Sequence, residues 1–364
     1  MYSYLKAGYH RYFHDPQAVL LALLLIAGLA TILLSGSLLG PLFVALLFAY
    51  LLEGAVSRLQ HRGLGRTLAA LLVFLAFLAT TVLIVLGLLP LLSHQFSQLL
   101  EEAPRMIGSG QEALHRLPEK YPALVSEEQI EELLQLLRSG LANLGQGALS
   151  FSLASIPAVF TALIYLILVP LLVLFLLKDK EQVVRWCTGF LPEKRSLLRQ
   201  IWSEMDSQMG NYIRGKFYEL AIVGTASYLL FASFSLNYAP LLAALVGLSV
   251  IVPYLGAFLV TVPVVLVALF QWGGGADSAW LIALYLVLQC LDGYVLVPLL
   301  FSQAVNLHPI AVIAAILFFG GLWGPWGVFF AIPLATLIKI LMQAWPRPLE
   351  GEDSRGSESE APLA

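Results

Sequence analysis

The sequence predicts an all-α polytopic membrane protein with about eight transmembrane segments, two of them broken or re-entrant, plus an amphipathic helical outer segment. Of its 364 residues, 59% are hydrophobic and only 12% are charged, and the mean hydropathy is +0.84. One soluble core cannot bury that much apolar surface. About 20 apolar residues cross a bilayer. Stretches that approach this length lie at approximately 17–34, 38–56, 67–92, 151–177, 217–236, 240–270, 279–299 and 309–341.

The first three spans form a predicted N-terminal region, residues 1–92. Two basic residues precede the first span, but no convincing small-residue cleavage site follows it, so we interpret it as a retained helix. Arg58, Arg62 and Arg66 lie between the second and third spans. Because cytoplasmic loops are enriched in Lys and Arg, we expect this loop in the cytoplasm.

Residues 93–150 are expected outside the cytoplasm as an amphipathic helical segment. They carry eight acidic residues against four Lys and Arg. Ser126, Glu127, Glu128 and Gln129 form a capping-box pattern, and apolar residues follow it at helical spacing. This apolar stripe either packs on a neighbouring helix or forms a surface that lies on the membrane or contacts another subunit.

The rest of the chain alternates between the membrane and the cytoplasm. The predicted regions are transmembrane helix 4 at 151–177, a cytoplasmic helical loop at 178–216, a transport core at 217–345 and a disordered cytoplasmic tail at 346–364. The cytoplasmic loop holds eight basic residues, and Leu198, Ile201 and Met205 recur in it with helical period. We expect this helix to cover the inner mouth of the bundle, with both termini in the cytoplasm.

Two spans contain proline and glycine residues that should interrupt their helices at membrane depth. Pro253 and Gly256 lie in the sixth stretch, and Gly324 and Gly327 lie in the eighth. A further proline follows at similar spacing in each, which suggests two related units. Interrupted helices in corresponding positions indicate a transporter's binding site, because freed backbone groups need protein or a wet cavity. The alternative is that the prolines simply kink packed helices.

Asp292 is the most informative single residue of the core. Within residues 239–338 the only formal charges are Asp277 and Asp292, and Asp292 lies well inside an apolar span. A carboxylate there is costly, so it is usually retained where it meets an ion, a proton or a polar substrate. Gln289 lies one turn earlier on the same face, and Gly293 would let another backbone approach. The alternative is a structural hydrogen-bond anchor between helices.

Other polar residues near the spans are weaker candidates. Asn306 and His308 precede Pro309 in a predicted turn, where a histidine titrating near neutral pH would link protons to transport. A helix cap or an interfacial contact is the alternative. Glu53 and Glu219 lie near the cytoplasmic ends of their spans, and we interpret both as ordinary interfacial charges.

The spacing of sequence motifs excludes several kinds of site. Residues 210–216 have the glycine and lysine spacing of a phosphate-binding loop, but Phe217 follows and no strand precedes them, so we expect no nucleotide. We find no metal-ligand cluster, nucleophile elbow or basic nucleic-acid patch, and therefore expect neither an enzyme nor a cofactor. Cys187 and Cys290 lie in a charged loop and an apolar span, so they form no disulfide framework.

Seven short segments resemble, in their order and spacing, the autoinducer-2 exporter family of bacterial membrane proteins. They lie at 41–50, 177–179, 212–215, 251–256, 291–298, 307–309 and 331–335. The resemblance implies a multi-pass protein of the bacterial inner membrane that moves a small solute or ion without hydrolysing nucleotide. It also implies a homo-oligomer, such as a pentamer.

Three functional hypotheses follow. The first is ion-driven export of a small polar solute like autoinducer-2, and the second is sodium/proton antiport with Asp292 as the exchanging carboxylate. The third is a non-transporting oligomeric membrane scaffold in which Asp292 is structural. In the transport hypotheses, the breaks near Pro253 and Gly256 and near Gly324 and Gly327 face Asp292. The expected partners are membrane lipids, the solute, and sodium or protons.

Overall fold

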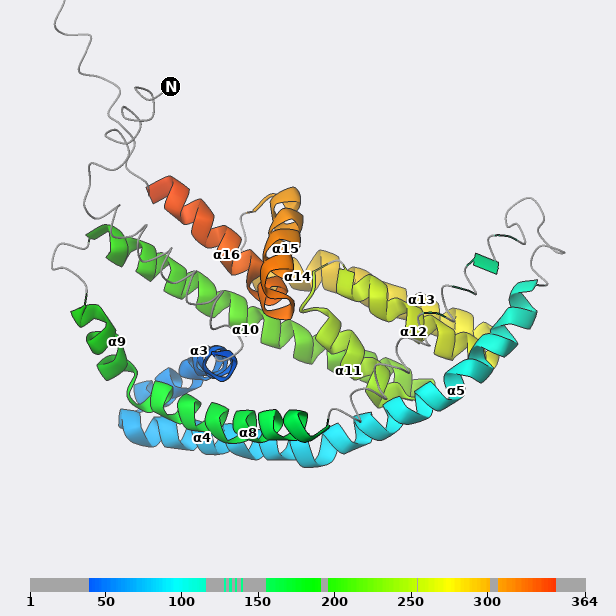
Figure 1. Ribbon diagram of the computed structural model, residues 1–364, viewed down its shortest axis with the longest axis horizontal. Helices are drawn as coiled ribbons and strands as arrows, with labels where there is room; N and C mark the ends of the chain where they lie inside the picture. Colours follow the sequence, from blue (N-terminus) through cyan, green and yellow to red (C-terminus); the bar gives the residue numbers. More distant parts are fainter. Residues whose placement is uncertain are drawn as a thin grey trace, which may run out of the picture. The chain divides into compact units, whose positions relative to one another are not determined.

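The computed structural model describes residues 39–115, 155–190, 196–253, 255–301 and 307–344, together with 128, 131, 132, 135 and 139. These residues form helices joined by turns (Figure 1), and none of them lies in a strand, which confirms the all-α prediction. Among them, six helices are long and apolar enough to cross a membrane, and two shorter apolar helices accompany these. The predicted first span, 17–34, lies outside the described residues.

The chain divides into two compact units. The larger unit contains residues 40–183 and 210–306, and the smaller unit contains the described parts of 184–209 and 307–364. Helix α9 (Lys180–Gly189) and helix α10 (Ser196–Ser233) each contribute residues to both units.

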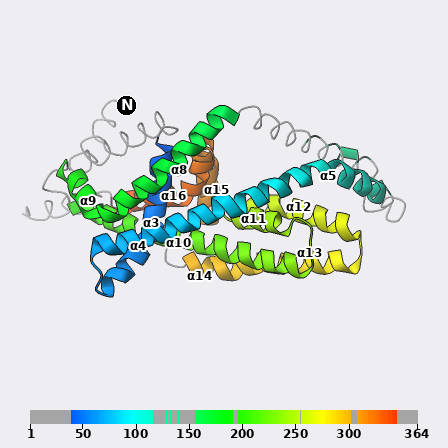
Figure 2. The same cartoon turned by 90° about the horizontal axis from the view of Figure 1, so that it is seen from below.

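Three helices of the larger unit pack together: α3 (Gly40–His61), α4 (Arg66–Leu83) and α8 (Ser155–Lys178). Helices α4 and α8 run alongside each other in Figure 1, and α3 runs across them in Figure 2. Ala45 and Ala49 of α3 and Ala69 and Ala70 of α4 are buried at these contacts. Such small residues let helix backbones approach closely where lipid offers no hydrophobic drive for association.

The third span continues as one curved helix into the predicted outer segment. Helix α4 leads through a π-helical turn, η1 (Ile84–Leu88), into α5 (Leu89–His115). Helix α5 covers the first part of the predicted 93–150 segment and is amphipathic. The predicted helix after Ser126 lies outside the described residues, apart from five helical positions between 128 and 139.

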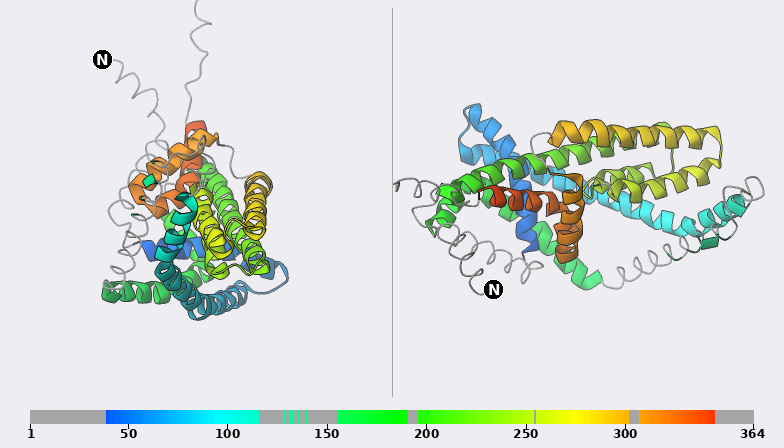
Figure 3. Two further views of the ribbon diagram at one scale, coloured as in Figure 1. Left: turned by 90° about the vertical axis from the view of Figure 1, so that its right-hand side faces the viewer. Right: turned by 90° about the horizontal axis from the view of Figure 1, so that it is seen from above.

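The second group of helices in the larger unit surrounds the main core. It comprises the part of α10 from Gly210, α11 (Ala239–Ser249), α12 (Leu255–Trp272), α13 (Ala276–Leu291), the π-helical turn η2 (Asp292–Leu296) and α14 (Val297–Phe301). Figures 1 and 3 show α12 and α13 running side by side. Gly224 of α10 meets Gly247 of α11, where an added Cβ on Gly247 would lie 3.1 Å from the Cα of Gly224. Gln95 of α5 accepts a hydrogen bond from the backbone N–H of Leu241 at the start of α11.

Helix α10 joins two predicted regions. The predicted cytoplasmic helix around Leu198 and the predicted fifth span are one continuous helix, so the boundary between residues 216 and 217 is not a helix end. In the smaller unit, Ile201 of α10 is buried against Ile340 of α16 (Pro325–Ala344).

Both predicted helix breaks are confirmed. Helix α11 ends at Ser249 and α12 begins at Leu255. Helix α15 (Pro309–Trp323) is followed directly by Gly324, whose φ is +61°. A Cβ on Gly256 would collide with the carbonyl oxygen of Ser249, and one on Gly327 with that of Phe319. In both helix pairs a glycine thus packs against a backbone carbonyl of the preceding helix, which supports the prediction of two related units.

The short helices of these pairs are too short to cross a bilayer. At about 1.5 Å per residue, α11 and α15 extend roughly 16 and 22 Å, against an apolar core of about 30 Å. The second proline of each stretch, Pro263 or Pro333, lies inside a continuous helix. Only the first Pro and Gly positions therefore mark the breaks.

Candidate functional site

A buried ion pair on α10 lies at the break between α11 and α12. Lys216 Nζ donates hydrogen bonds to Oε2 of Glu219 and to the backbone carbonyl of Val250, each at 2.7 Å. The side chains of Lys216 and Glu219 are only 7% and 3% exposed. Val250 is the residue after α11, where a helix leaves carbonyls without a partner in the next turn. The ammonium therefore satisfies both a carboxylate and a broken helix end.

The ring of Phe301 covers the same ammonium. Its centroid lies 5.2 Å from Lys216 Nζ, within the range of a cation–π interaction. Phe301 also lies 5.8 Å, centroid to centroid, from Tyr212. A Cβ on Gly215 would approach the Phe301 ring to 2.7 Å. Gly215 thus leaves the space in which the aromatic ring reaches the lysine.

Asp292 brings a second carboxylate to this region, and we call Lys216, Glu219 and Asp292 the buried charge cluster. Asp292 interacts electrostatically with both other members. It is half-buried at the start of η2, and its Oδ1 is buried without a hydrogen-bond partner among the described residues. Unsatisfied buried acceptors are rare in folded proteins. This oxygen is consequently the acceptor of the cluster that is open to a ligand.

A line of hydrogen-bonding side chains on α12 and α13 ends at Gln289, three residues before Asp292. Gln289 Nε2 donates to the hydroxyl of Tyr285 at 2.9 Å, and this hydroxyl lies 3.2 Å from Oγ1 of Thr261 on α12. Tyr285, Gln289 and Asp292 recur at helical spacing, so they share one face of α13. The prediction that Gln289 and Asp292 share a face is compatible with this, but the hydrogen bond of Gln289 goes to Tyr285.

The other predicted site residues of the larger unit have different roles. Pro253 lies in the α11–α12 break, and Gly256 packs at the start of α12 against α11. No described backbone approaches Gly293: an added Cβ would meet no described atom within 4 Å, and Gly293 is exposed on the π-helical turn. The expected backbone approach at this residue stays a prediction.

Three of the remaining predicted site residues, His308, Gly324 and Gly327, belong to the smaller unit. Asn306 is outside the described residues. His308 is exposed and caps α15, where its Nδ1 accepts a hydrogen bond from the N–H of Ile310 at 3.3 Å. Gly324 and Gly327 form the α15–α16 break, and their approach to Asp292 stays a prediction.

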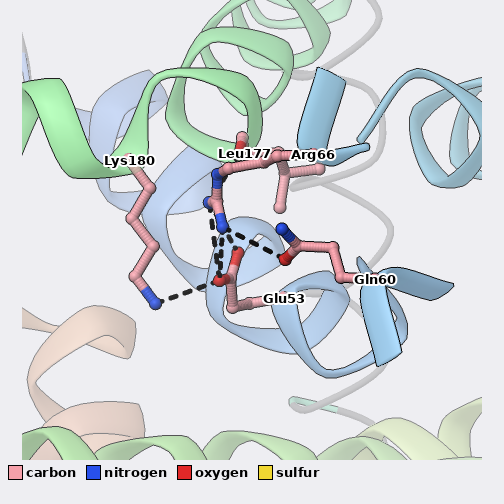
Figure 4. A network of polar contacts seen from close by, with 5 residues as sticks. All are labelled: Glu53, Gln60, Arg66, Leu177 and Lys180. Carbon is pink, nitrogen blue, oxygen red and sulfur yellow. Dashed lines mark hydrogen bonds and ion pairs between the residues drawn. The ribbon is translucent and has the colours of Figure 1, made fainter. Parts of the chain in front are cut away.

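Figure 4 shows a second polar network at the ends of α3, α4 and α8. Arg66 pairs with Glu53 at 3.4 Å and donates a 2.8 Å hydrogen bond to the carbonyl of Leu177. Lys180 Nζ reaches the same Glu53 carboxylate at 3.1 Å, and Gln60 accepts from Arg66 at 3.4 Å. Glu53 is therefore not an ordinary interfacial charge. It ties three helices together at one end of their bundle.

Two members of the buried charge cluster were missed by sequence reasoning. Glu219 is 2% exposed, so its interpretation as an interfacial charge that reaches water was wrong. Lys216 is the last residue of the predicted cytoplasmic loop. A signal was present, because Lys216 and Glu219 are three residues apart, a spacing at which helical side chains pair.

The buried charge cluster offers groups for cation and proton chemistry. In the part of the chain that the structure describes, no group of three His, Cys, Asp or Glu side chains could hold a metal ion. The cluster combines two carboxylates, one ammonium and a helix-end carbonyl. Such groups exchange protons or bind monovalent cations at membrane depth.

Comparison with known proteins points to membrane transport. Residues 21–347 match the family described as AI-2E family transporter. The chain is 47% identical over 346 residues to "Putative permease PerM" of Escherichia coli (strain K12), covering 95% of this chain and 98% of that protein. It is 27% identical over 306 residues to "Putative transport protein YueF" of Bacillus subtilis (strain 168), covering 82% of each. "Putative transport protein YrrI" of the same strain is 26% identical over 308 residues, 83% of this chain and 85% of that protein.

Proposed function

Because this chain belongs to the AI-2E transporter family, we propose that it is a secondary transporter that exports a small polar solute and is driven by an ion gradient. The transporter class and the multi-pass membrane setting rest on the family, on the relatives' names and on the apolar helices. An autoinducer-2-like solute and the export direction extend the family's name to this chain. The bacterial inner membrane is the proposed location.

The buried charge cluster is the observation that carries ion coupling. Glu219 pairs with the one ammonium and Asp292 interacts with it electrostatically, so one negative charge is in excess when all three groups are ionised. Uncompensated charge at such depth is costly, so a proton or a sodium ion bound at Asp292 would stabilise the site. The Val250 carbonyl at the helix break adds a ligand of the kind found at transporter ion sites.

The line of side chains on α13 supports a polar solute. Thr261, Tyr285 and Gln289 offer hydroxyl and amide groups inside an otherwise apolar bundle. A solute with hydroxyl groups would exchange hydrogen bonds with them on its way to Asp292. Alternating access around the α11–α12 break would then expose this line to each side of the membrane in turn.

Sodium/proton antiport is the second candidate. It is favoured by Asp292 Oδ1, the buried carboxylate oxygen that has no hydrogen-bond partner among the described residues. An exchanging carboxylate needs such an open position, because a fully hydrogen-bonded oxygen would first have to lose a partner. In this candidate, the ion is the transported species and no organic solute is required.

Flux measurements in liposomes test both candidates. The purified protein is reconstituted with an internal pH-sensitive dye, and a sodium gradient or a candidate solute is applied. We expect the Asp292→Asn variant to lose at least about 90% of ion-coupled flux, in line with loss of an essential charged group. The matched control is Asp277→Asn, which changes the exposed carboxylate at the start of the same helix and should retain flux.

The outcomes separate the candidates. Sodium-dependent proton flux without any solute supports antiport, whereas proton flux that requires the solute supports ion-coupled export. Full activity of Asp292→Asn would remove Asp292 from coupling. Absence of every flux from a folded wild-type protein would favour the scaffold hypothesis.

A further inference from the structure

The surroundings of the Lys216 ammonium form a cation site. Its hydrogen-bond acceptors are the Glu219 carboxylate and the Val250 carbonyl, both at 2.7 Å, and the face of Phe301 lies over it. Each of these groups directs negative charge or a negative quadrupole at the nitrogen. Asp292 adds a second negative charge to the site.

Nothing in this set of ligands is specific for an amine. A carboxylate and a carbonyl at the end of a broken helix also coordinate sodium in membrane transporters, and the C-terminal end of a helix favours cations. The Val250 carbonyl follows the last residue of α11. The ammonium therefore occupies a position that a free monovalent cation would also favour.

The ammonium of Lys216 lies at the α11–α12 break, but Lys216 itself belongs to another helix. Lys216 lies on α10, and it reaches Val250, which is 34 residues further along the chain. Its aliphatic stem makes the ammonium a tethered cation. In a different rotamer of Lys216, the Glu219 carboxylate and the Val250 carbonyl would lose this cation, and Asp292 would add a second negative charge without a counter-ion.

We propose that Lys216 acts as a built-in substitute for a monovalent cation, so that its ammonium and a sodium ion compete for the position between the Glu219 carboxylate and the Val250 carbonyl, on which Asp292 acts as a second negative charge. This inference rests on the proposed function for its role in transport, since it names the ion that the cluster would exchange. The binding site itself is independent of any transport measurement.

Removal of the tethered charge tests the competition. The full-length Lys216→Met variant keeps most of the side-chain volume and lacks the ammonium. Its melting temperature is followed by tryptophan fluorescence in detergent, in sodium chloride and in choline chloride of equal ionic strength. An alkaline buffer keeps the two carboxylates ionised. At a sodium concentration about 100 times the dissociation constant, we expect sodium to raise the melting temperature by roughly 5 °C.

Three controls define the result. The wild-type protein and the variant Lys178→Met, which removes an exposed lysine, should melt at the same temperature in both salts. The double variant Lys216→Met/Glu219→Gln should lose the sodium response. Lys216→Arg should resemble the wild type, because it retains a tethered cation.

A folded Lys216→Met variant that melts equally in sodium and choline would overturn the proposal. If Lys216→Met does not fold in either salt, Lys216→Met/Asp292→Asn replaces it, because this double variant buries one carboxylate fewer. A sodium response in that variant supports the site, and its absence rejects it. A sodium response together with failure of all flux assays would preserve the cation site while refuting the proposed transport function.

Discussion

Arg66 is a single side chain on which the packing of three helices depends. Its guanidinium, 20% exposed, joins Glu53 of α3 to the carbonyl of Leu177 near the end of α8. Arginine can do this because its planar group carries five donors in a fixed fork, whereas lysine offers one compact ammonium. The link therefore depends on guanidinium geometry as well as charge.

Substitution of this guanidinium should be measurable. We expect Arg66→Lys to lower the free energy of unfolding by about 1–2 kcal/mol, because one ammonium cannot replace the hydrogen bonds to Glu53, Gln60 and the Leu177 carbonyl at once. Titration with sodium dodecyl sulfate gives the unfolding free energy in micelles. Arg62→Lys, at an exposed position in the same loop, should change it by less than about 0.5 kcal/mol. Equal effects of the two substitutions would show that the guanidinium geometry is unimportant.

The sequence pattern identified Asp292 as a candidate but did not identify Lys216 and Glu219. An isolated carboxylate in an apolar span is visible in sequence because its cost does not depend on what packs around it. The burial of Lys216 and Glu219 depends instead on which turn of α10 meets the α11–α12 break. That alignment arises from long-range packing, including the contact between Gly224 and Gly247. Local hydropathy does not reveal this alignment of α10 with the α11–α12 break.

At the scale of elements, the predicted helices and breaks agree better with the structure than the predicted boundaries do. Proline and glycine act on the nearest turn of backbone, so Pro253, Gly256 and Gly324 could be located from sequence. The continuity of α10 through residue 216 could not, because the charges around Arg214 interrupt the apolar run without interrupting the helix. Hydropathy reports the environment of a helix rather than its ends.

The α11–α12 break should be sensitive to one added methyl group. We expect Gly256→Ala to destabilise the protein by about 1–3 kcal/mol, because the new Cβ would overlap the Ser249 carbonyl and push the two helices apart. Gly87→Ala is the matched control: its Cβ would meet no described atom within 4 Å. That substitution should be neutral or stabilising by up to about 1 kcal/mol. Comparable losses in both variants, measured by detergent unfolding, would argue against tight packing at Gly256.

At the scale of the whole molecule, the orientation in the membrane can be tested with the natural cysteines. Cys187 is exposed on α9, close to Lys180 and Arg185. The excess of positive charge predicts that this segment lies in the cytoplasm. In spheroplasts, a membrane-impermeant maleimide should label a Cys290→Ser variant at Cys187 only after the membrane is permeabilised.

A cysteine introduced on the opposite side gives the control. Glu101 is exposed on α5 in the predicted outer segment. In a protein with both natural cysteines changed to serine, Glu101→Cys should react in intact spheroplasts. Reaction of Cys187 in intact spheroplasts, with protection of the introduced cysteine, would reverse the proposed orientation.

The π-helical turn η2 determines the direction in which the side chains after Asp292 point around the helix axis. In an unbroken α-helix, the nine positions from Asp292 to Phe301 would turn the ring about 180° away from the carboxylate. The extra residue accommodated in η2 reduces this to roughly 80°, so Phe301 is 7% exposed while Leu299 is 71% exposed. The direction of Phe301 relative to Asp292 around the helix axis thus depends on one i to i+5 hydrogen bond, from the Val297 N–H to the Asp292 carbonyl. Conversion of this turn to regular α-helix would rotate Phe301 away from the ammonium without altering a single side chain.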